Sequence, residues 1–428
     1  MTEIAGHMRI RSNRVADARR TRCYNPRLMK TERVIRCAAV VLIVALGVAY
    51  ALFSFPANRE DTSRLLDFSE FYAAGQMVRQ GLGSSLYDLR IQAEFQLKVA
   101  PVHAFYLRPP FEALLFVPFT FLSYRAAYTA WLLFSLAVLA GMTRLIQGNT
   151  NVLDAMLQYT RGIPVDAGLL LVVFLTFSPT MDCLLIGQDS VLMLMIYTLV
   201  FLALKRGREL EAGALLACGL FKFHLVLPFA IIFALRRRGS FVLGFAGVAL
   251  LLVAISVLVS GPGVLASYPA MFLNSQYRML MGFQPEYAAN IRGLVYLIAG
   301  DKIPVAISGA VVAALSALLL WVSARTWKNN EVEFGFSAAV IATLLTGYHS
   351  FVYDLSLLLL PVAIVCGELA KRKILLSNLT LNSTLVVLFV QPLHHLLIVQ
   401  HIYALMCVPV VVLFVCVVRI AARQPAEP

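Results

Sequence analysis

The chain has 428 residues, of which 60% are hydrophobic and only 14% are charged. A soluble domain carries about 25% charged residues, so the composition excludes an ordinary water-soluble protein. The formal net charge of +13 is compatible with nucleic-acid binding, but ten of the 36 Lys and Arg residues lie in residues 1–36 and most others lie in short loops between apolar segments. This distribution is typical of a multi-pass membrane protein whose basic loops stay in the cytoplasm.

The N-terminal part of the chain is predicted to be a basic cytoplasmic tail, residues 1–36, that can contact anionic lipid. An uncleaved first span at 37–55 follows it, and a long external loop occupies 56–124. The apolar stretch 111–122 in this loop is too short to cross about 30 Å of hydrocarbon. It therefore predicts a juxtamembrane or re-entrant helix.

The remaining apolar segments predict an all-α, polytopic transmembrane helical bundle with about ten full crossings, of which 37–55 is the first. The basic loops orient these crossings with both chain ends in the cytoplasm. They form a single membrane domain, 37–420, which has a second external loop at 261–301 and is followed by a cytoplasmic tail, 421–428. The other crossings are predicted at 126–146, 164–181, 188–204, 239–260, 303–324, 333–347, 351–367, 379–393 and 402–419.

The segment 211–235 is apolar at both ends but polar at its centre, where Gly219, Lys222, His224 and Pro228 lie. It is flanked by basic loops on both sides, and a single crossing would place one of them outside. Broken helices with polar centres occur where they line a cavity inside protein. We expect two re-entrant half-helices with Lys222 and His224 near mid-membrane, and a single continuous span is the open alternative.

Polar residues of unusual type gather on the predicted external face. An ionisable side chain inside or at the edge of the membrane is costly, so such residues are functional candidates. The cytoplasmic loops, by contrast, carry mostly Lys and Arg. The external set comprises Asp67, Glu70, Tyr72, Arg108, Asp182, Gln188, Asp189, Gln284, Glu286, Asn290, Arg292, His349, Tyr353, Asp354 and His394.

Several of these residues also have a purely structural interpretation. Asp67 is placed to cap a helix beginning at Phe68, with Glu70 completing a capping box. Gln188 and Asp189 can likewise cap the next span. Lys222 can extend toward the membrane interface, and the Arg108-Pro109-Pro110 run can start a helix. His349 and Tyr353 lie one helical turn apart and can satisfy each other's hydrogen bonds. Arg292 resists such an explanation, because it is a permanent charge on the external side.

Five motifs, in order along the chain, resemble glycosyltransferase family 87. They are "DFSEFYAAGQMVRQGLGSSLYD" (67–88), "FYLRPPFEALLFVPF" (105–119), "LLIGQDSVLML" (184–194), "EAGALLACGLFKFHLVLPF" (211–229) and "YDLSLLLLP" (353–361). The resemblance implies a membrane glycosyltransferase of the GT-C type, with juxtamembrane helices in the first external loop. It also implies a polyprenyl-phosphate-linked donor, commonly of mannose, and an outward-facing active site. The catalytic carboxylate of the family's first loop corresponds to Asp67, and its Lys in the broken segment corresponds to Lys222.

These residues suggest a single-displacement mechanism. Asp67 is expected to act as general base on an acceptor hydroxyl, which predicts inversion at the anomeric carbon. Lys222 and Arg292 are expected to stabilise the leaving phosphate, helped by His349 and Tyr353. Because a lipid phosphate carries less charge than a nucleotide diphosphate, we expect neither a metal nor another cofactor. Contacts to the sugar or to a lipid or glycan acceptor are expected from Glu70, Tyr72, Arg108, Gln188, Asp189, His224, Asn290 and Asp354.

Other classes of membrane protein remain open at this point. A transporter or flippase of a lipid-linked sugar would explain a broken segment, but such proteins usually contain repeated halves, and this chain shows no repeat. An envelope polysaccharide ligase would share the donor, but we would expect its largest external loop late in the chain. A structural scaffold leaves the external cluster of ionisable residues unexplained. The expected location is the inner (plasma) membrane, with the site facing the periplasm or exterior and no nucleic-acid partner.

Overall fold

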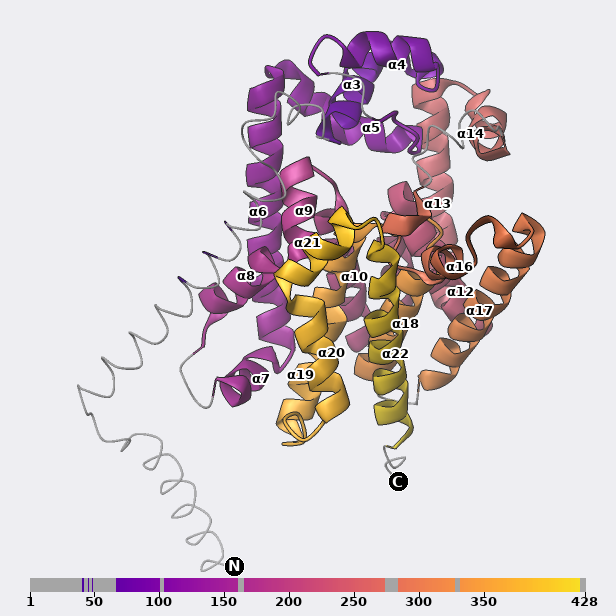
Figure 1. Cartoon of the computed structure of the whole chain (residues 1–428). Helices are drawn as coiled ribbons and strands as arrows, with labels where there is room; N and C mark the ends of the chain where they lie inside the picture. Colours follow the sequence, from indigo (N-terminus) through magenta and orange to yellow (C-terminus); the bar gives the residue numbers. More distant parts are fainter. Residues whose placement is uncertain are drawn as a thin grey trace, which may run out of the picture.

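A computed structural model describes residues 67–100, 104–160, 165–273, 284–327 and 332–423, together with the helical positions Val41, Ala45 and Val48. Apart from those three positions, the predicted basic tail and the first span lie outside the described residues. The described part of the chain consists of helices joined by loops and contains no strand. This agrees with the predicted all-α fold (Figure 1).

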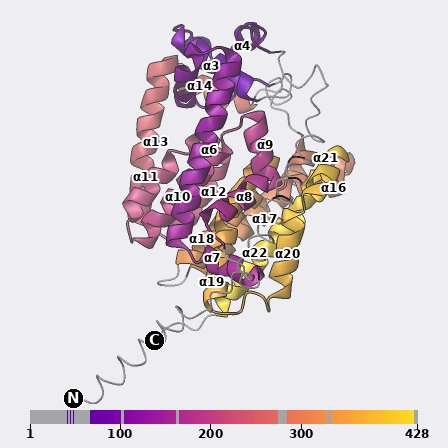
Figure 2. The same cartoon turned by 90° about the vertical axis from the view of Figure 1, so that its left-hand side faces the viewer.

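Short helices form a cap over one end of the bundle, at the top of Figures 1 and 2. The helix expected after Asp67 is α3 (Phe68–Arg79), and the short apolar stretch forms α5 (Pro110–Phe116) and η3 (Val117–Phe121). Pro110 begins α5, where its fixed φ suits a helix and no backbone N–H is needed. The rings of Phe71 and Phe116 stack at 4.6 Å and hold α3 against α5. The other cap elements are η2 (Gly83–Ser85), α4 (Leu89–Gln96) and α14 (Val264–Leu273).

Five helical stretches in the described chain are long and apolar enough to cross a membrane. Each corresponds to a predicted crossing, and the observed Gly239–Ser260 has the predicted bounds. They are α6 (Tyr124–Asn149), α13 (Gly239–Ser260), α17 (Val305–Thr326), η7 with α19 (Val352–Leu358 and Leu359–Lys371), and η8 with α22 (Tyr403–Met406 and Cys407–Ala422).

Two segments that were predicted as single spans are each divided into two helices by a bend. α8 (Ala167–Thr176) and α9 (Ser178–Ile186) meet at 73°, and α20 (Leu379–Phe389) and α21 (Gln391–Val399) meet at 59°. In both cases a proline, Pro179 or Pro392, stands in the first turn of the second helix. Proline lacks the N–H that would continue the preceding helix, and its ring clashes with the carbonyl four residues earlier. In the sequence itself, the two prolines indicate a bend. The segments were assigned as spans from their apolar length, without regard to these prolines.

The count of crossings depends on how bent helix pairs are treated. Counting each bent pair as one span gives up to eight candidates in the described chain. The predicted crossings at 188–204 and 333–347 form the shorter helices α10 (Ser190–Lys205) and α18 (Val332–Thr346). Both are almost wholly enclosed by other helices at the centre of the bundle (Figure 1). Ten crossings therefore remain a prediction. The remaining elements are α7 (Val152–Tyr159), η5 (Pro285–Tyr287), α16 (Ile291–Ala299) and η6 (Gly300–Lys302).

The broken segment consists of α11 (Glu209–Ala217), η4 (Leu220–Lys222) and α12 (Phe223–Leu235), with a 65° bend at the break. Its two ends meet, because the guanidinium of Arg238 lies 3.2 Å from the carboxylate of Glu209. Its turn lies at the far end of α10, where Lys222 contacts Ser190. The segment therefore enters and leaves at one end of the bundle, which favours the re-entrant pair over the single span.

Helices α11 and α13 cross with their backbones in direct contact. A Cβ atom on Gly244 would lie 2.0 Å from the carbonyl oxygen of Leu210, and one on Gly213 would lie 1.9 Å from that of Phe241. Small residues at helix crossings allow such close approach in membrane proteins. This crossing anchors the re-entrant segment against α13.

The crossing predicts a position-specific effect of a single methyl group. We expect Gly244→Ala to lower the free energy of unfolding by about 1–3 kcal/mol, because the added Cβ must push the two backbones apart. Gly247→Ala on the next turn of α13 is the matched control, since no atom lies within 4 Å of its added Cβ. Thermal unfolding in detergent measures both. Equal effects at the two positions would contradict the close crossing.

Candidate active site

The candidate site lies under the cap, where the turn of the re-entrant segment meets the starts of α10 and η7. Lys222 at this turn is fully buried. Its ammonium nitrogen lies 2.9 Å from Asp189 Oδ1 and 2.7 Å from Asp354 Oδ1, and it donates to Ser190 Oγ at 2.6 Å. Ser190 in turn donates to Asp354 at 2.8 Å. A single ammonium group thus joins three separate parts of the chain.

Asp189 reaches this position because α9 ends in a tight turn. Gly187 adopts φ 78°, and a Cβ there would lie 2.6 Å from the Cβ of Phe68, so only glycine fits without displacement. Asp189 then occupies the N-cap position of α10, but its side chain accepts no hydrogen bond from that helix. It pairs instead with Lys222 and, at 3.1 Å, with Arg108. The expected capping role of its side chain is therefore wrong.

A hydrogen-bonded chain extends from this centre to Asp67. Arg108 donates to the side-chain oxygen of Gln188 at 3.1 Å, and the amide nitrogen of Gln188 donates to Asp67 Oδ2 at 2.5 Å. Asp67 occupies the N-cap position of α3 as predicted, but its backbone is helical and its side chain makes no cap hydrogen bond. An N-cap residue normally has extended backbone, which aims its side chain at the first turn. The predicted capping box is therefore wrong, and the carboxylate points at Gln188.

Asp354 connects the centre to a group of aromatic and histidine side chains. Its second oxygen accepts the backbone N–H of Phe351 at 3.0 Å and lies 3.9 Å from His224 Nε2. The ring of His349 lies 6.0 Å from that of His224, and the ring of Tyr353 lies 4.7 Å from the ammonium of Lys222. Burial and the neighbouring His224 hold the pKa of His349 well below its ordinary value, so this ring is neutral at pH 7.

Carboxyl groups outnumber permanent cations in the described cluster. The cations are Arg108 and Lys222. The carboxyl groups are those of Asp67, Asp189 and Asp354 and of two further buried acids, Glu70 and Glu112. Burial raises the pKa of Glu70 well above its ordinary value, and the charge of Asp67 adds to that increase. Burying uncompensated charge is costly, so a protonated Glu70 is the lower-energy state.

Three predicted site residues have mainly structural contacts. Tyr72 donates to the carbonyl of Leu122 at 2.8 Å and ties α3 to the end of η3. Asn290 caps α16 through Gly293 N–H at 2.8 Å and donates to the carbonyl of Gly347 at 2.7 Å. Arg292 lies at a more exposed rim, where it donates to the carbonyl of Tyr348 at 3.0 Å and lies 4.3 Å from the Tyr348 ring. These contacts hold Arg292 beside Tyr348 at the rim.

Two residues of the cluster were absent from the sequence-based set. Ser190 bridges Lys222 and Asp354, and Glu112 is buried beside Arg108. A hydroxyl at the start of a helix carries no distinctive signal. Glu112 did carry one, because it is an acid within an apolar stretch at the membrane edge. In the described part of the chain, no group of three His, Cys, Asp or Glu side chains is arranged to hold a metal ion.

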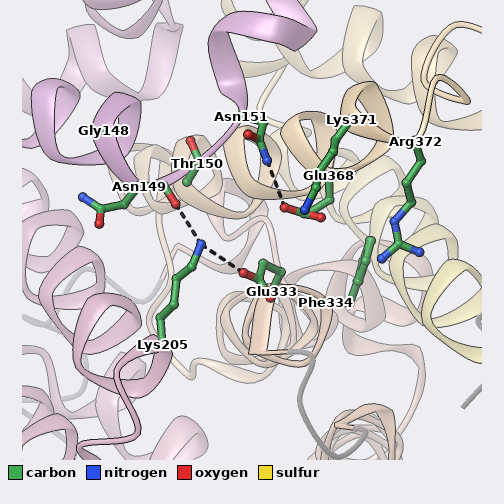
Figure 3. Close-up of a pocket in the computed structure, with 10 residues that line it drawn as sticks. All are labelled: Gly148, Asn149, Thr150, Asn151, Lys205, Glu333, Phe334, Glu368, Lys371 and Arg372. Atoms are coloured by element: carbon green, nitrogen blue, oxygen red, sulfur yellow. Dashed lines mark hydrogen bonds and ion pairs between the residues drawn. The ribbon is translucent and has the colours of Figure 1, made fainter. Parts of the chain in front are cut away.

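A cavity of 620 Å³ lies at the opposite end of the bundle and contains none of the predicted site residues (Figure 3). Its Lys205 is the last residue of α10, whereas Asp189 precedes the first, and 16 residues of helix separate the two regions by roughly 24 Å. Lys205 donates to the last carbonyl of α6 at 2.9 Å and pairs with Glu333 at 3.1 Å. Cations at helix C-termini commonly have such a stabilising role. The full lining is Gly148, Asn149, Thr150, Asn151, Lys205, Glu333, Phe334, Glu368, Lys371 and Arg372.

Removing the central ammonium should damage the fold. We expect Lys222→Met to lower the free energy of unfolding by about 3–5 kcal/mol, because Asp189 and Asp354 lose a partner inside the protein. Lys205→Met is the matched control, because the Lys205–Glu333 pair is partly exposed and such pairs contribute at most about 1 kcal/mol. Thermal unfolding in detergent measures both variants. Equal stability of the two would show that Lys222 does not hold the cluster together.

A comparison with protein-family models places these residues in context. The model described as glycosyltransferase family 87 matches residues 106–352, more than half of the chain. Arg108, Gln188, Asp189 and Lys222 lie inside the matched range, whereas Asp67 lies before it. No curated protein and no solved structure gives a significant match to the chain.

Proposed function

The chain belongs to glycosyltransferase family 87, and on this basis we propose that it transfers a hexose, with mannose the expected sugar, from a polyprenyl-phosphate donor to a hydroxyl of a lipid or glycan acceptor. The general activity of a membrane glycosyltransferase follows from the family and from the apolar helices. The donor, the sugar and the acceptor are the proposed part. We assign the reaction to the cluster under the cap.

The observation that supports this assignment is that Asp67 is more exposed than the other aspartates of the cluster, Asp189 and Asp354. Asp189 and Asp354 contact the ammonium of Lys222 directly, and a carboxylate so paired is a weak base. Asp67 accepts a hydrogen bond from the side-chain amide of Gln188. It is also only partly buried. Asp67 is therefore the acid of the cluster best suited to accept a proton from an acceptor hydroxyl.

The proposed reaction is a single displacement. Asp67 takes the hydroxyl proton while the hydroxyl oxygen bonds to the anomeric carbon, and the bond from that carbon to the phosphate oxygen breaks. The electron pair leaves with the polyprenyl phosphate, and the configuration inverts. We assign phosphate contacts to Arg292 at the rim and to His349 and Tyr353 beside the cluster. We assign a positioning role to Lys222, because two carboxylates already hold it. Stabilisation of the leaving group by such donors is a large part of transferase catalysis.

The distribution of basic loops supports an outward-facing site. The runs at 205–208 and 236–238 flank the re-entrant segment, and the run at 371–373 follows α19. Lys205, Lys371 and Arg372 line the cavity at the end opposite the cap. Basic loops stay in the cytoplasm, so we propose that the cap and the cluster face the periplasm or exterior of the inner (plasma) membrane.

One observation favours a second function, the transport of a lipid-linked sugar. Transporters often place their substrate at the break of a discontinuous helix, and Lys222 lies at such a break. The two functions differ in one simple respect. Purified protein in detergent has no compartments, so the formation of a glycosylated product from polyprenyl-phosphate-mannose would exclude pure transport.

The catalytic assignment predicts that Asp67→Asn lowers the rate of transfer by roughly 10²–10⁴-fold, the usual contribution of a general base. Asparagine can still accept the hydrogen bond from Gln188, so we expect the variant to fold. Product formation from polyprenyl-phosphate-mannose is the measurement. Glu94→Gln, which removes an exposed acid of the same external loop, is the control and should keep full activity. Full activity of Asp67→Asn would rule out the assignment, and loss of activity in Glu70→Gln alone would move the role to Glu70.

A further inference from the structure

Glu112 is a buried acid close to a second buried acid, Asp189. It lies in the first turn of α5 and is only 2% exposed. Its Oε2 lies 3.3 Å from the Tyr106 hydroxyl, whose one hydrogen also has the Pro109 carbonyl as an acceptor at 2.9 Å. Asp189 lies near enough to raise the pKa of the Glu112 carboxyl group through its charge and through a side-chain hydrogen bond. Among the described residues, no donor reaches Glu112 Oε1, and Asp189 Oδ1 accepts no well-directed hydrogen bond although it lies 2.9 Å from Lys222 Nζ.

Two carboxylates close together inside a protein do not both stay ionised, because repulsion and lost hydration act together. One proton between the two oxygens removes the repulsion and gives each oxygen a hydrogen-bond partner. Asp189 is the member that stays ionised, since it is paired with both Arg108 and Lys222. The proton therefore belongs on Glu112.

We propose that Glu112 is a neutral positioning residue that donates a hydrogen bond to Asp189 and thereby holds Arg108 and Gln188 in line with Asp67. The path is direct, because Asp189 binds one nitrogen of Arg108 and Gln188 binds the other. Gln188 then donates to Asp67. The effect on transfer rests on the proposed function, whereas the protonation state of Glu112 does not.

The groups that face Glu112 determine how it responds to pH. Burial raises its pKa well above 4.5, Arg108 opposes this shift, and Asp189 increases it. Burial also raises the pKa values of the neighbouring tyrosines, so they stay neutral over the range in which Glu112 titrates. The charged and titratable groups around it are Glu70 from α3, Tyr87, Tyr106 and Arg108 from the loops of the cap, Tyr268 from α14, and Asp189 from the turn before α10.

A raised pKa in the folded state has a definite consequence for stability. The unfolded chain releases the Glu112 proton near pH 4.5, while the folded protein keeps it. The contribution of Glu112 to stability is therefore complete below pH 4.5 and falls as the pH rises toward the folded pKa, by up to about tenfold in the folding equilibrium constant per pH unit.

The first experiment uses Glu112→Gln, whose amide donates like a protonated carboxyl group but does not titrate. In thermal unfolding in detergent, the wild-type protein should lose stability relative to Glu112→Gln as the pH rises above 4.5. Glu94→Gln is the control and should follow the wild type at every pH. Parallel curves for the wild type and Glu112→Gln would overturn the proposal.

An infrared measurement keeps the proposal testable if Glu112→Gln does not fold. The Glu70→Gln protein retains Glu112 as the buried acid expected to be neutral, and should show the carbonyl band of a protonated carboxyl group at pH 7. The band should disappear when the pH is raised above the pKa of Glu112. Absence of the band at pH 7 would overturn the protonation assignment.

The positioning role is tested by transfer activity. We expect Glu112→Ala to lower the rate about 10²-fold through misalignment of the chain that ends at Asp67, and Glu112→Gln to restore most of it. Wild-type activity in Glu112→Ala, or a folded but inactive Glu112→Gln, would overturn the positioning role. If no variant and no wild-type protein transfers sugar, the proposed function fails, while the pH and infrared results still decide the protonation of Glu112.

Discussion

The pairing of the buried ammonium of Lys222 with Asp189 and Asp354 is the interaction on which the site depends. A lone cation buried inside a protein is costly. It is stabilised here because a carboxylate reaches it from the start of α10 and another from the start of η7. The two ion pairs therefore bring the turn of the re-entrant segment against two central helices. Hydrogen bonds through Arg108 and Gln188 connect these ion pairs to Asp67. The position of the proposed base therefore depends on the ion pairs that Lys222 makes with the other two aspartates.

Two acids show how far local sequence patterns describe this site. The sequence predicted correctly that a helix begins after Asp67, and the bounds of α13 were also correct. The predicted span at 188–204 begins two residues before α10. The direction of the Asp67 and Asp189 side chains was not predicted correctly. An acid before a helix serves equally well as a cap or as a partner for a distant cation, and only the approach of Arg108 and Lys222 decides between them. Such partners lie far away in the sequence, so residue spacing does not indicate them.

Other differences between the prediction and the structure had local causes in the sequence. They were overlooked because these segments were assessed by their apolar length. Pro179 and Pro392 lie at the bends of two segments that were predicted as single spans. Glu112 lies in a stretch that was assessed only for its length and hydrophobicity, although an acid there was itself unusual. The break in segment 211–235 was predicted correctly because its evidence included charge, with a basic loop at each end and a lysine at its centre. Charge was thus more informative than hydrophobicity for this part of the fold.

The three residues of the two central ion pairs, Asp189, Lys222 and Asp354, are synthesised at different times. The chain emerges from its N-terminus, so Asp189 is synthesised shortly before Lys222, and Asp354 follows after 131 further residues of the chain. Until then Lys222 has one of its two carboxylate partners. The ion pairs are complete only after α13, α17 and α18 have been made, which couples completion of the site to assembly of most of the bundle. A chain truncated before η7 would keep the sequence of the proposed base and lack the contact that centres the site.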